Sequence, residues 1–598
     1  MSHSKGKRRH FVSLPSQDNI VTDVEHPGAG GSSATSKCDD QPGLSVDTLP
    51  SPKSLGTSPG INPADEHGGL RRGLSTRQVQ MIAIGGTIGT GLFLGTSKSL
   101  AQGGPGSMLI AYSIVGSIVY VTLLLLGEMA TQYPVAGSFS TYAYRFFSPS
   151  YSFALSYNYW FNDAVSVASD LVAAQILLQF WTDWHPWVIS LVFWVFLVVV
   201  NGVYVGAYGE LEYWLASLKV ATIAVFVIIG VMVNLGGNTS NEYIGGKNWR
   251  VGDAPFVGGF GGFARVFVTA SFAYGGTESL GVTAGETKNP SKNMPRVVKA
   301  VFWRILIFYI LSILLVGLNV PYNYPGLSTE STATSPFTIV FEMAGSRVAG
   351  SFVNTVVITS VLSAGNHALF TGTRVLYSLA VTKPVALAPR VFAWTTKRGV
   401  PLPALLATSS VSVVCFGSSH IGSGQLWSWL QNLVGVSNQI TWLSIGLASW
   451  RFRKAWVSQG RPIEELKFRA GWTWPWGPYF VVSGQSAHRL IVQGWSSIFP
   501  EFSAVDFVSL YLEIPVVIVM WFGWIAICRL MKRSTHSDTT PANRGVSGVL
   551  DIVDLRTIDL TSDEYRDVVE DDEEEALRQK RISQGRRRFL WRIYYLAA

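Results

Sequence analysis

The chain has 598 residues, of which 48% are hydrophobic, 13% aromatic and only 14% charged. This composition excludes an ordinary soluble domain and indicates a polytopic helical membrane protein. The net charge of +8 is spread over loops and tails, which fits the excess of Lys and Arg in cytoplasmic loops better than a nucleic-acid-binding face.

Hydrophilic tails enclose the apolar part of the chain. Residues 1–75 are rich in Ser, Gly, Pro and Asp, and the segment after about residue 530 holds most of the remaining dense charge. Such segments bury too little apolar surface to fold. We therefore expect a disordered N-terminal tail over 1–75, a membrane domain over 76–530 and a largely disordered C-terminal tail over 531–598.

About twelve apolar stretches follow one another in the membrane domain, each of roughly the twenty residues that a helix needs to cross a bilayer. They cover 81–102, 107–127, 151–181, 187–206, 213–235, 263–284, 301–320, 348–380, 402–421, 427–450, 478–498 and 505–530. The sequence therefore predicts an all-α membrane protein.

Basic residues set the orientation of these spans. Three arginines precede the first span, and most of the others fall in even-numbered connections, which the positive-inside rule places in the cytoplasm. The residues concerned are Arg71, Arg72, Arg77, Arg145, Lys288, Lys292, Arg296, Lys299, Arg390, Lys397, Arg398, Arg451, Arg453 and Lys454. Both termini are expected in the cytoplasm.

Glycines interrupt two spans at matching places in two halves of the chain. The first run covers 85–91 and the second covers 273–278. Glycine costs a helix interior about 1 kcal/mol relative to alanine, and backbone groups freed inside a bilayer need a partner. Paired breaks of this kind predict the substrate site of a transporter, where unwound backbone groups bind the ligand.

Ionisable groups inside spans are costly, at about 2.5 to 3.5 kcal/mol each at mid-bilayer, so the few present are informative. They are Asp163, Asp170, Lys219, Glu278, His367 and Arg374. Asn158, Asn162, Ser166 and Ser169/Asp170 follow one another at helical spacing, so they form a polar stripe that lines the bundle interior. Hydrogen bonding between helices is the alternative role for this stripe.

Lys219 lies about two turns inside the fifth span. Its ammonium group either exchanges a proton during transport or forms a permanent ion pair with an acidic neighbour. For Glu128 and Glu286, at span ends, helix packing is the expected role, and His367 and Arg374 stay unassigned.

Several motifs resemble the fungal amino-acid permeases, the yeast amino-acid transporter branch of the amino acid/polyamine/organocation superfamily. They extend over about residues 70 to 530. The matching runs are Arg72-Gly73-Leu74-Ser75, residues 80–95 around the first break, Leu126-Gly127-Glu128-Met129-Ala130-Thr131, residues 157–162, residues 284–290, residues 363–370 and Lys397-Arg398-Gly399-Val400-Pro401.

The resemblance implies a leucine-transporter-like fold, with two inverted five-helix repeats broken in spans one and six, plus two extra helices. It implies that the substrate carboxylate binds backbone N–H groups of Ile88, Gly89, Thr90 and Gly91, where a half-helix N-terminus favours an anion. The α-ammonium group is expected on carbonyls of Ile84 or Thr87 and of Phe272, Ala273 and Gly275. Gly276, Thr277 and Glu278 of the second break are also expected to belong to the substrate site.

Further roles follow from the same resemblance. Phe272 is expected to close over the substrate. Lys219 matches a lysine that stands where sodium-coupled relatives bind the ion, so proton symport without a metal or other cofactor is expected, with Lys219 and Asp170 as the coupling groups. Asn366, Ser437 and Asn438 are expected to contact the substrate side chain, with a broad neutral range preferred.

Three features depart from the family pattern. Asp170 stands where relatives more often carry Glu, and residues 380–389 lack the usual acidic-glycine turn. Span eleven contains His488 and Arg489 where an apolar helix is expected. That stretch is either a genuine variant packed against other helices or an artefact of gene prediction.

The sequence thus predicts a secondary active importer of L-α-amino acids, coupled to protons and working by alternating access, and not an enzyme. A non-transporting amino-acid sensor and a transporter of another organic amine are the alternatives. The resemblance implies the plasma membrane, with ubiquitin-dependent endocytosis acting at cytoplasmic lysines; candidate acceptors are Lys5, Lys7, Lys37 and Lys53. The basic block around 578–588 is either solvated or lies on anionic lipid.

Overall fold

The computed structural model describes residues 81, 88–135, 137–182, 184–203, 205–284, 290–327, 335–345, 347–382, 389–396, 398–487, 492–498, 502–534, 546–547 and 550–565. These residues all lie in one compact unit, 61–598. The expectations for Ile84, Thr87, Glu286, His488, Arg489 and the N-terminal lysines fall outside the described residues.

The first half of the membrane domain consists of helices that match the expected spans. They are α2 (Thr90–Phe93), α3 (Gly95–Gln132), α4 (Ser138–Tyr142), η2 (Ala143–Phe147), α5 (Pro149–Leu178), α6 (Pro186–Val203), α7 (Val205–Asn234), η3 (Lys247–Arg250), α8 (Gly259–Ala273), α9 (Ser279–Ala284), α10 (Pro290–Arg304), η4 (Ile305–Leu311) and α11 (Ser312–Asn319).

The second half continues in the same way and ends in a short hairpin. Its elements are α12 (Pro336–Met343), α13 (Arg347–Thr382), α14 (Pro389–Phe392), α15 (Leu402–Val411), η5 (Ser412–Gly417), α16 (Ser418–Ile421), α17 (Ser423–Ser458), η6 (Ile463–Glu465), η7 (Gly471–Thr473), α18 (Gly477–Ala487), α19 (Trp495–Ile498), α20 (Ala504–Tyr511), α21 (Glu513–Ser534), β1 (Val546–Ser547) and β2 (Ile552–Val553).

Within the described residues, eight helices are long and apolar enough to cross a membrane on their own. The other four expected spans, numbers one, six, ten and eleven, are broken, short or more polar, but each coincides with helical residues: α2 with the start of α3, α8 with α9, α17, and α18 with α19. The expected all-α membrane fold with breaks in the first and sixth spans is therefore confirmed.

Local sequence explains several helix boundaries. The N-cap Ser148 accepts a hydrogen bond from the backbone N–H of Tyr151 at 3.2 Å, and Pro149 occupies the first turn of α5, so this start is set by side-chain chemistry. The boundary expected between the first two spans, 81–102 and 107–127, is present as a kink at Gly104 within α3. Gly104 has φ of +75° and ψ of 173°, which is outside the helical region, and Pro105 follows it, so two helical segments meet here at a kink.

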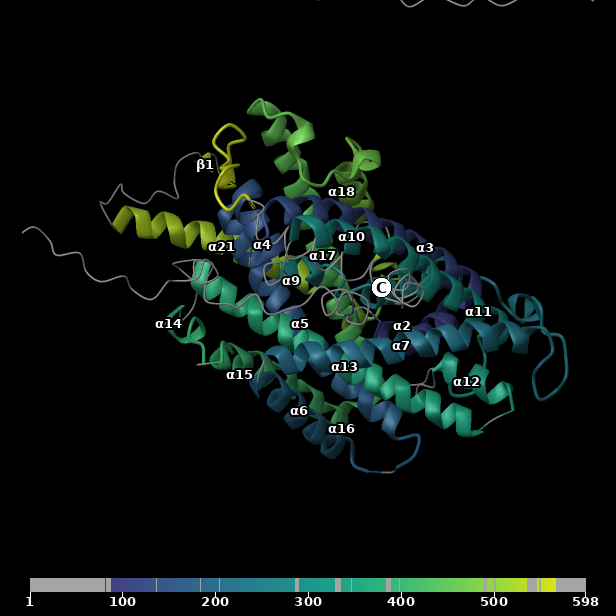
Figure 1. Cartoon of the computed structure of the whole chain (residues 1–598). Helices are drawn as coiled ribbons and strands as arrows, with labels where there is room; N and C mark the ends of the chain where they lie inside the picture. The colour runs from purple at the N-terminus through teal and green to yellow at the C-terminus, as the bar shows by residue number, and fades with distance from the viewer. Residues whose placement is uncertain are drawn as a thin grey trace, which may run out of the picture. The chain divides into compact units, whose positions relative to one another are not determined.

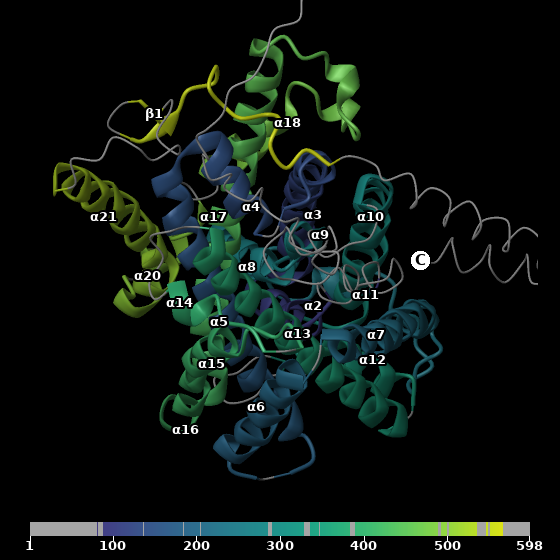
Figure 2. The ribbon, with the colours of Figure 1, turned by 60° about the vertical axis from the view of Figure 1, so that its left-hand side comes forward.

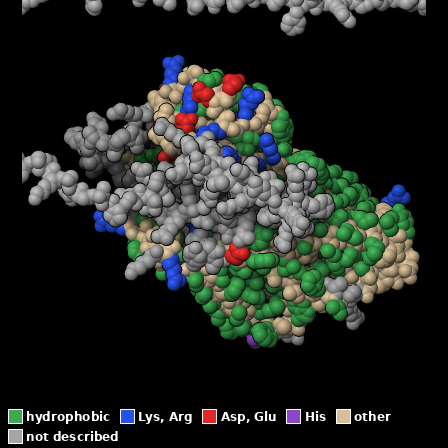
Figure 3. Space-filling model, in the orientation of Figure 1, with side chains coloured by type: hydrophobic (Ala, Val, Ile, Leu, Met, Phe, Trp, Pro, Cys, Tyr) green, Lys and Arg blue, Asp and Glu red, His purple; other side chains and the backbone are tan. Residues whose placement is uncertain are grey.

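Five long helices form the centre of the bundle. α5 packs along α13 and α17, and α3 packs along α8, so segments far apart in sequence lie side by side (Figure 1 and Figure 2). α6 and α21 lie at the periphery, where Val192 is 58% exposed and Val519 is 68% exposed. In Figure 3 hydrophobic side chains cover much of the visible body, whereas charged side chains gather on the lobe at the top, as expected for lipid-facing and water-facing regions.

A buried ion pair fixes one end of the bundle. Arg453 on α17 donates to both carboxylate oxygens of Glu128 on α3, at 2.9 Å and 2.8 Å, and also to the carbonyl of Thr473 at 3.3 Å. The two side chains are 5% and 0% exposed. The packing role expected for Glu128 is thereby confirmed.

Residues 550–565 of the C-terminal tail depart from the prediction of disorder. β1 and β2 pair antiparallel, and residues 550–565 hydrogen-bond to the ends of α3, η2 and α17. Tyr133 donates to the carbonyl of Leu560 at 2.8 Å, and Arg461 pairs with Glu564 at 2.9 Å. Ile558 and Leu560 are 3% and 2% exposed. This contact could not be predicted from composition, because the few buried apolar residues of the segment lie among charged ones.

Candidate functional site

The two glycine-rich breaks lie against each other at the centre of the bundle. α2 begins at Thr90 after the non-helical Gly89, and α8 ends at Ala273 before a turn that includes Gly276 at φ +80°. A Cβ atom on Gly91 would lie only 2.3 Å from the Cα of Ala273. Glycine is therefore required at residue 91 for this close approach of two backbones.

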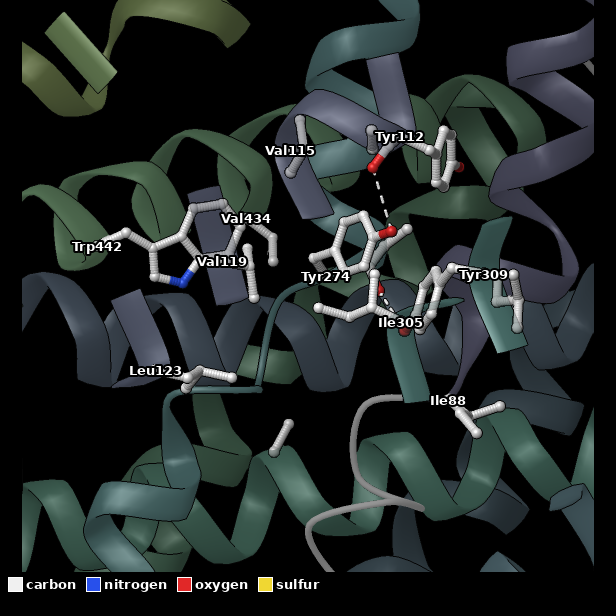
Figure 4. Close-up of a cluster of buried hydrophobic side chains, with 14 of the residues drawn as sticks. Ile88, Tyr112, Val115, Val119, Leu123, Tyr274, Ile305, Tyr309, Val434 and Trp442 are labelled. Carbon is white, nitrogen blue, oxygen red and sulfur yellow. Dashed lines mark hydrogen bonds between the residues drawn. The ribbon is translucent and has the colours of Figure 1, made fainter. Parts of the chain in front are cut away.

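Hydroxyl groups hold the end of α8 in place. Tyr309 donates to the carbonyl of Ala273 at 2.9 Å, and Tyr274 donates to the carbonyl of Tyr112 at 3.1 Å. Tyr274 stacks on Tyr309 with 4.3 Å between ring centroids (Figure 4). The Ala273 carbonyl keeps one lone pair for another donor, since a carbonyl oxygen accepts two hydrogen bonds.

A cavity of about 60 Å³ lies beside the two breaks, with room for about four water molecules. Seven of the expected substrate-binding residues line it, together with polar and apolar groups of α5, α13 and α17. The lining residues include Gly89, Thr90, Gly91, Phe272, Ala273, Gly275, Gly276, Asn162, Asp163, Ser166, Asp170, Ser279, His367, Thr371 and Asn438. Six residues of the predicted breaks, the predicted Phe272 and the predicted Asp170 therefore meet at one cavity.

The polar stripe of α5 serves both of the roles considered for it. Asn158 donates to Ser437 at 2.7 Å and Asn162 donates to Asn438 at 3.1 Å, so these two bridge helices. Asn162 also lines the cavity, as does Asp170, which accepts a hydrogen bond from the hydroxyl of Thr90 in the first break. One face of α5 thus ties α17 to the first break and supplies a wall of the cavity.

Glu278 is hydrogen-bonded to other residues of the protein, which its position in the second break did not predict. Its carboxylate accepts from Tyr159 at 3.1 Å, from the indole N–H of Trp442 at 3.0 Å and from the backbone N–H of Gly276 at 3.3 Å. Ile88, Thr277 and Glu278 do not line the cavity. Glu278 therefore holds the shape of the second break and faces its own hydrogen-bond donors.

Lys219 lies in a separate buried cluster between α7 and α13. Its ammonium group donates to Ser363 at 2.8 Å, and Ser363 in turn donates to Glu212 at 2.6 Å. The nitrogen of Lys219 lies 3.9 Å from the carboxylate of Glu212, and the side chains are 1% and 0% exposed. Lys219 does not line the cavity, so any coupling to the substrate passes through neighbouring groups.

Glu212 belongs to this cluster although the sequence did not predict it. It occurs in Gly209-Glu210-Leu211-Glu212, which reads as a hydrated helix start. The spacing of seven residues to Lys219 was the available signal, because such residues share one helix face.

The remaining predicted residues have other partners. Nε2 of His367 lies 2.7 Å from the hydroxyl of Ser279, which links α13 to α9. Arg374 lies 3.2 Å from the ring centroid of Phe370. Asn366 accepts from Asn201 at 2.7 Å and does not line the cavity, so of the three expected side-chain contacts only Asn438 lies at the cavity wall.

Sequence comparisons give the site its context. Residues 78–537 match the family described as amino acid permease. A probable amino-acid permease of Schizosaccharomyces pombe is 44% identical over 473 residues, which cover 76% of this chain and 92% of the relative. The lysine-specific permease LysP of Escherichia coli is 40% identical, with 76% and 93% covered, and the general amino-acid permease GAP1 of Saccharomyces cerevisiae is 38% identical, with 76% and 77% covered.

Proposed function

The chain belongs to the amino acid permease family, and from that premise we propose that it is a secondary active transporter that imports L-α-amino acids together with protons. The family membership makes it a multi-pass membrane protein of amino acid transport. The direction, the proton and the alternating access are the parts that we propose.

The observation that carries the proposal is the meeting of the two breaks at one polar cavity. Gly91 and Ala273 are in backbone contact, and the cavity beside them is lined by the first turn of α2 and the last turn of α8. A helix start offers free N–H groups and a positive dipole end, and a helix end offers free carbonyls. Together they complement the carboxylate and the ammonium group of an amino acid.

Lys219 and Asp170 are the proposed coupling groups, and Glu212 joins them. Asp170 lies at the cavity and is bonded to Thr90, whereas Lys219 shares Ser363 with Glu212. A buried charge is costly unless it is paired, so each of these groups is sensitive to the protonation of the next. Movement of the first break would change the surroundings of Asp170 and thereby pass a proton between the carboxylates.

The orientation follows from the basic residues. We propose that the end of the bundle carrying Arg145, Arg451 and Arg461 faces the cytoplasm, in the plasma membrane, with both termini on that side. The docked segment 550–565 would then be a cytoplasmic surface. Ubiquitin-dependent endocytosis at the tails remains part of the proposal.

The test is uptake of a radiolabelled amino-acid panel by permease-deficient fungal cells that express this chain at their surface. We expect accumulation of at least one amino acid, and we expect carboxylate-free amines not to compete. Normal surface expression with no uptake of any amino acid would favour a sensor, and competition by carboxylate-free amines would favour an amine transporter.

A further inference from the structure

Asp163 is a buried carboxylate in the cavity wall that the proposed transport cycle does not use. It is 5% exposed, and its Oδ2 atom has no hydrogen-bond partner among the described residues. The side chain lies between α5 and α13, where a Cβ atom on Gly372 would be 2.9 Å from the Cβ of Asp163. An isolated buried carboxylate is unfavourable, so this group calls for a positive partner or a proton.

The charges around the cavity make a cationic partner the better fit. Asp163 and Asp170 both line the cavity, and of the lining residues only His367 is able to carry a positive charge. The imidazole of His367 is already hydrogen-bonded to Ser279. Glu278, which interacts electrostatically with Asp163, is another carboxylate. The described wall is thus acidic and supplies no countercharge of its own.

The spacing along α5 matches the length of a basic side chain. Asp163 lies two helical turns from Asp170, which is about 10 Å at a rise of 1.5 Å per residue, and Asp170 is bonded to Thr90 in the first break. The side chain of lysine extends about 6 Å from its Cα atom, and a charge-assisted hydrogen bond adds about 3 Å. An amino acid whose head group lies at the break therefore reaches Asp163 with a terminal cation.

We propose that Asp163 is a subsite for the positively charged side chain of the substrate, so that this chain prefers cationic amino acids such as arginine and lysine. This inference rests on the proposed function, since it names the substrate class of the same site, and it replaces the expectation of a broad neutral range. The cavity of about 60 Å³ must widen to admit such a substrate, which the proposed alternating access provides.

Arginine and citrulline are the matched probes, because they have nearly the same shape and differ in the charge of the side chain. Uptake of each is measured in permease-deficient cells expressing the native chain, Asp163→Asn or Asp163→Glu. We expect the native chain to favour arginine at least tenfold in apparent KM, Asp163→Asn to abolish this preference while citrulline uptake is retained, and Asp163→Glu to restore part of it.

Three controls accompany the variants: a check of folding, a matched substitution away from the cavity and a measurement of binding. No described group hydrogen-bonds Oδ2 of Asp163, so Asp163→Asn breaks no interaction at that atom, and thermal unfolding of the purified protein checks this directly. Glu464→Gln makes the same chemical change at an exposed residue away from the cavity and is expected to leave both KM values unchanged. Protection against unfolding by arginine, and its loss in Asp163→Asn, provides a readout of binding that does not depend on transport.

Three results would overturn the inference, and they differ in whether they also contradict the proposed import of amino acids. Equal uptake of arginine and citrulline by the native chain refutes the subsite but leaves amino acid import standing. Loss of both uptakes in a well-folded Asp163→Asn assigns Asp163 to the transport step itself, for instance as a proton carrier. No uptake of any amino acid by the native chain removes the proposed function and the subsite together.

Discussion

Lys219 and Glu212 lie on the same face of α7 with their charged atoms 3.9 Å apart, and Ser363 of α13 bridges them by hydrogen bonds of 2.8 Å and 2.6 Å. The acidic partner expected for Lys219 is therefore present, whereas proton exchange by this group stays a prediction. Mutations that remove the charges singly and together separate these two roles.

Lys219→Met leaves Glu212 buried without its cation. Truncating one partner of a buried pair costs about 3 to 5 kcal/mol, whereas neutralising both partners is close to neutral. We expect Lys219→Met to be poorly expressed and Lys219→Met/Glu212→Gln to fold. If the pair couples transport, the folded double variant exchanges substrate across the membrane but does not accumulate it.

The measurement compares counterflow with net accumulation in membrane vesicles. A double variant that accumulates substrate as the native chain does would assign the pair a purely structural role. Ser363→Ala, which removes the bridge and keeps both charges, serves as the matched control and is expected to lower accumulation less than the double variant does.

Gly91→Ala tests the contact between the two breaks. The added Cβ would lie 2.3 Å from the Cα of Ala273, a backbone atom that is not free to rotate away. We expect loss of uptake by at least tenfold with surface expression retained. Gly523→Ala on α21 is the control, because nothing lies within 4 Å of its added Cβ and alanine is the better helix former; equal activity of the two variants would contradict the described contact.

The sequence revealed much of this site and concealed the rest for identifiable reasons. The breaks were predictable from Gly89, Gly91 and Gly276, because glycine is unfavourable inside a helix. The role of Asp170 was indicated by its charge, because membrane spans rarely carry one. Sequence spacing does not reveal partners. Glu278 faces Tyr159 and Trp442, and Asn366 faces Asn201 rather than the cavity, because these contacts depend on how distant helices pack.

The Glu128–Arg453 pair is expected to stabilise the bundle because each buried charge compensates the other. Glu128→Gln leaves the guanidinium group of Arg453 buried with one charged partner lost, and we expect a marked decrease in the thermal unfolding temperature, corresponding to about 3 to 5 kcal/mol. The double variant Glu128→Leu/Arg453→Met should lose less stability than the sum of the losses of Glu128→Leu and Arg453→Met measured singly. Additive losses in a thermal unfolding assay would show that the two side chains do not act as a pair.

Asp559 gives the docked C-terminal segment a pH dependence. Partial burial raises the pKa of its carboxyl group, but hydrogen bonds from Ser562 and Thr561 outweigh this, so the pKa lies below its usual value. Because the pKa of Asp559 is lower in the docked state than in the undocked state, this carboxylate stabilises docking at pH values above its undocked pKa of about 4. The stabilisation is lost as the pH falls toward the pKa of the docked state.

Hydrogen exchange of residues 550–565, corrected for intrinsic pH effects, measures this docking. We expect protection to be constant near neutral pH and to decrease as the pH falls below about 4. Asp559→Asn should exchange faster at pH 7 and lack the acid-dependent part. A native chain and an Asp559→Asn variant with the same protection at neutral pH would remove the role assigned to this carboxylate.

Proton-coupled import is the central claim, and simultaneous measurement of proton and substrate fluxes in proteoliposomes containing the purified chain tests it most directly. With arginine supplied outside, we expect proton entry that depends on substrate, and accumulation that collapses when a protonophore is added. Substrate entry without proton movement, unaffected by the protonophore, would contradict the account.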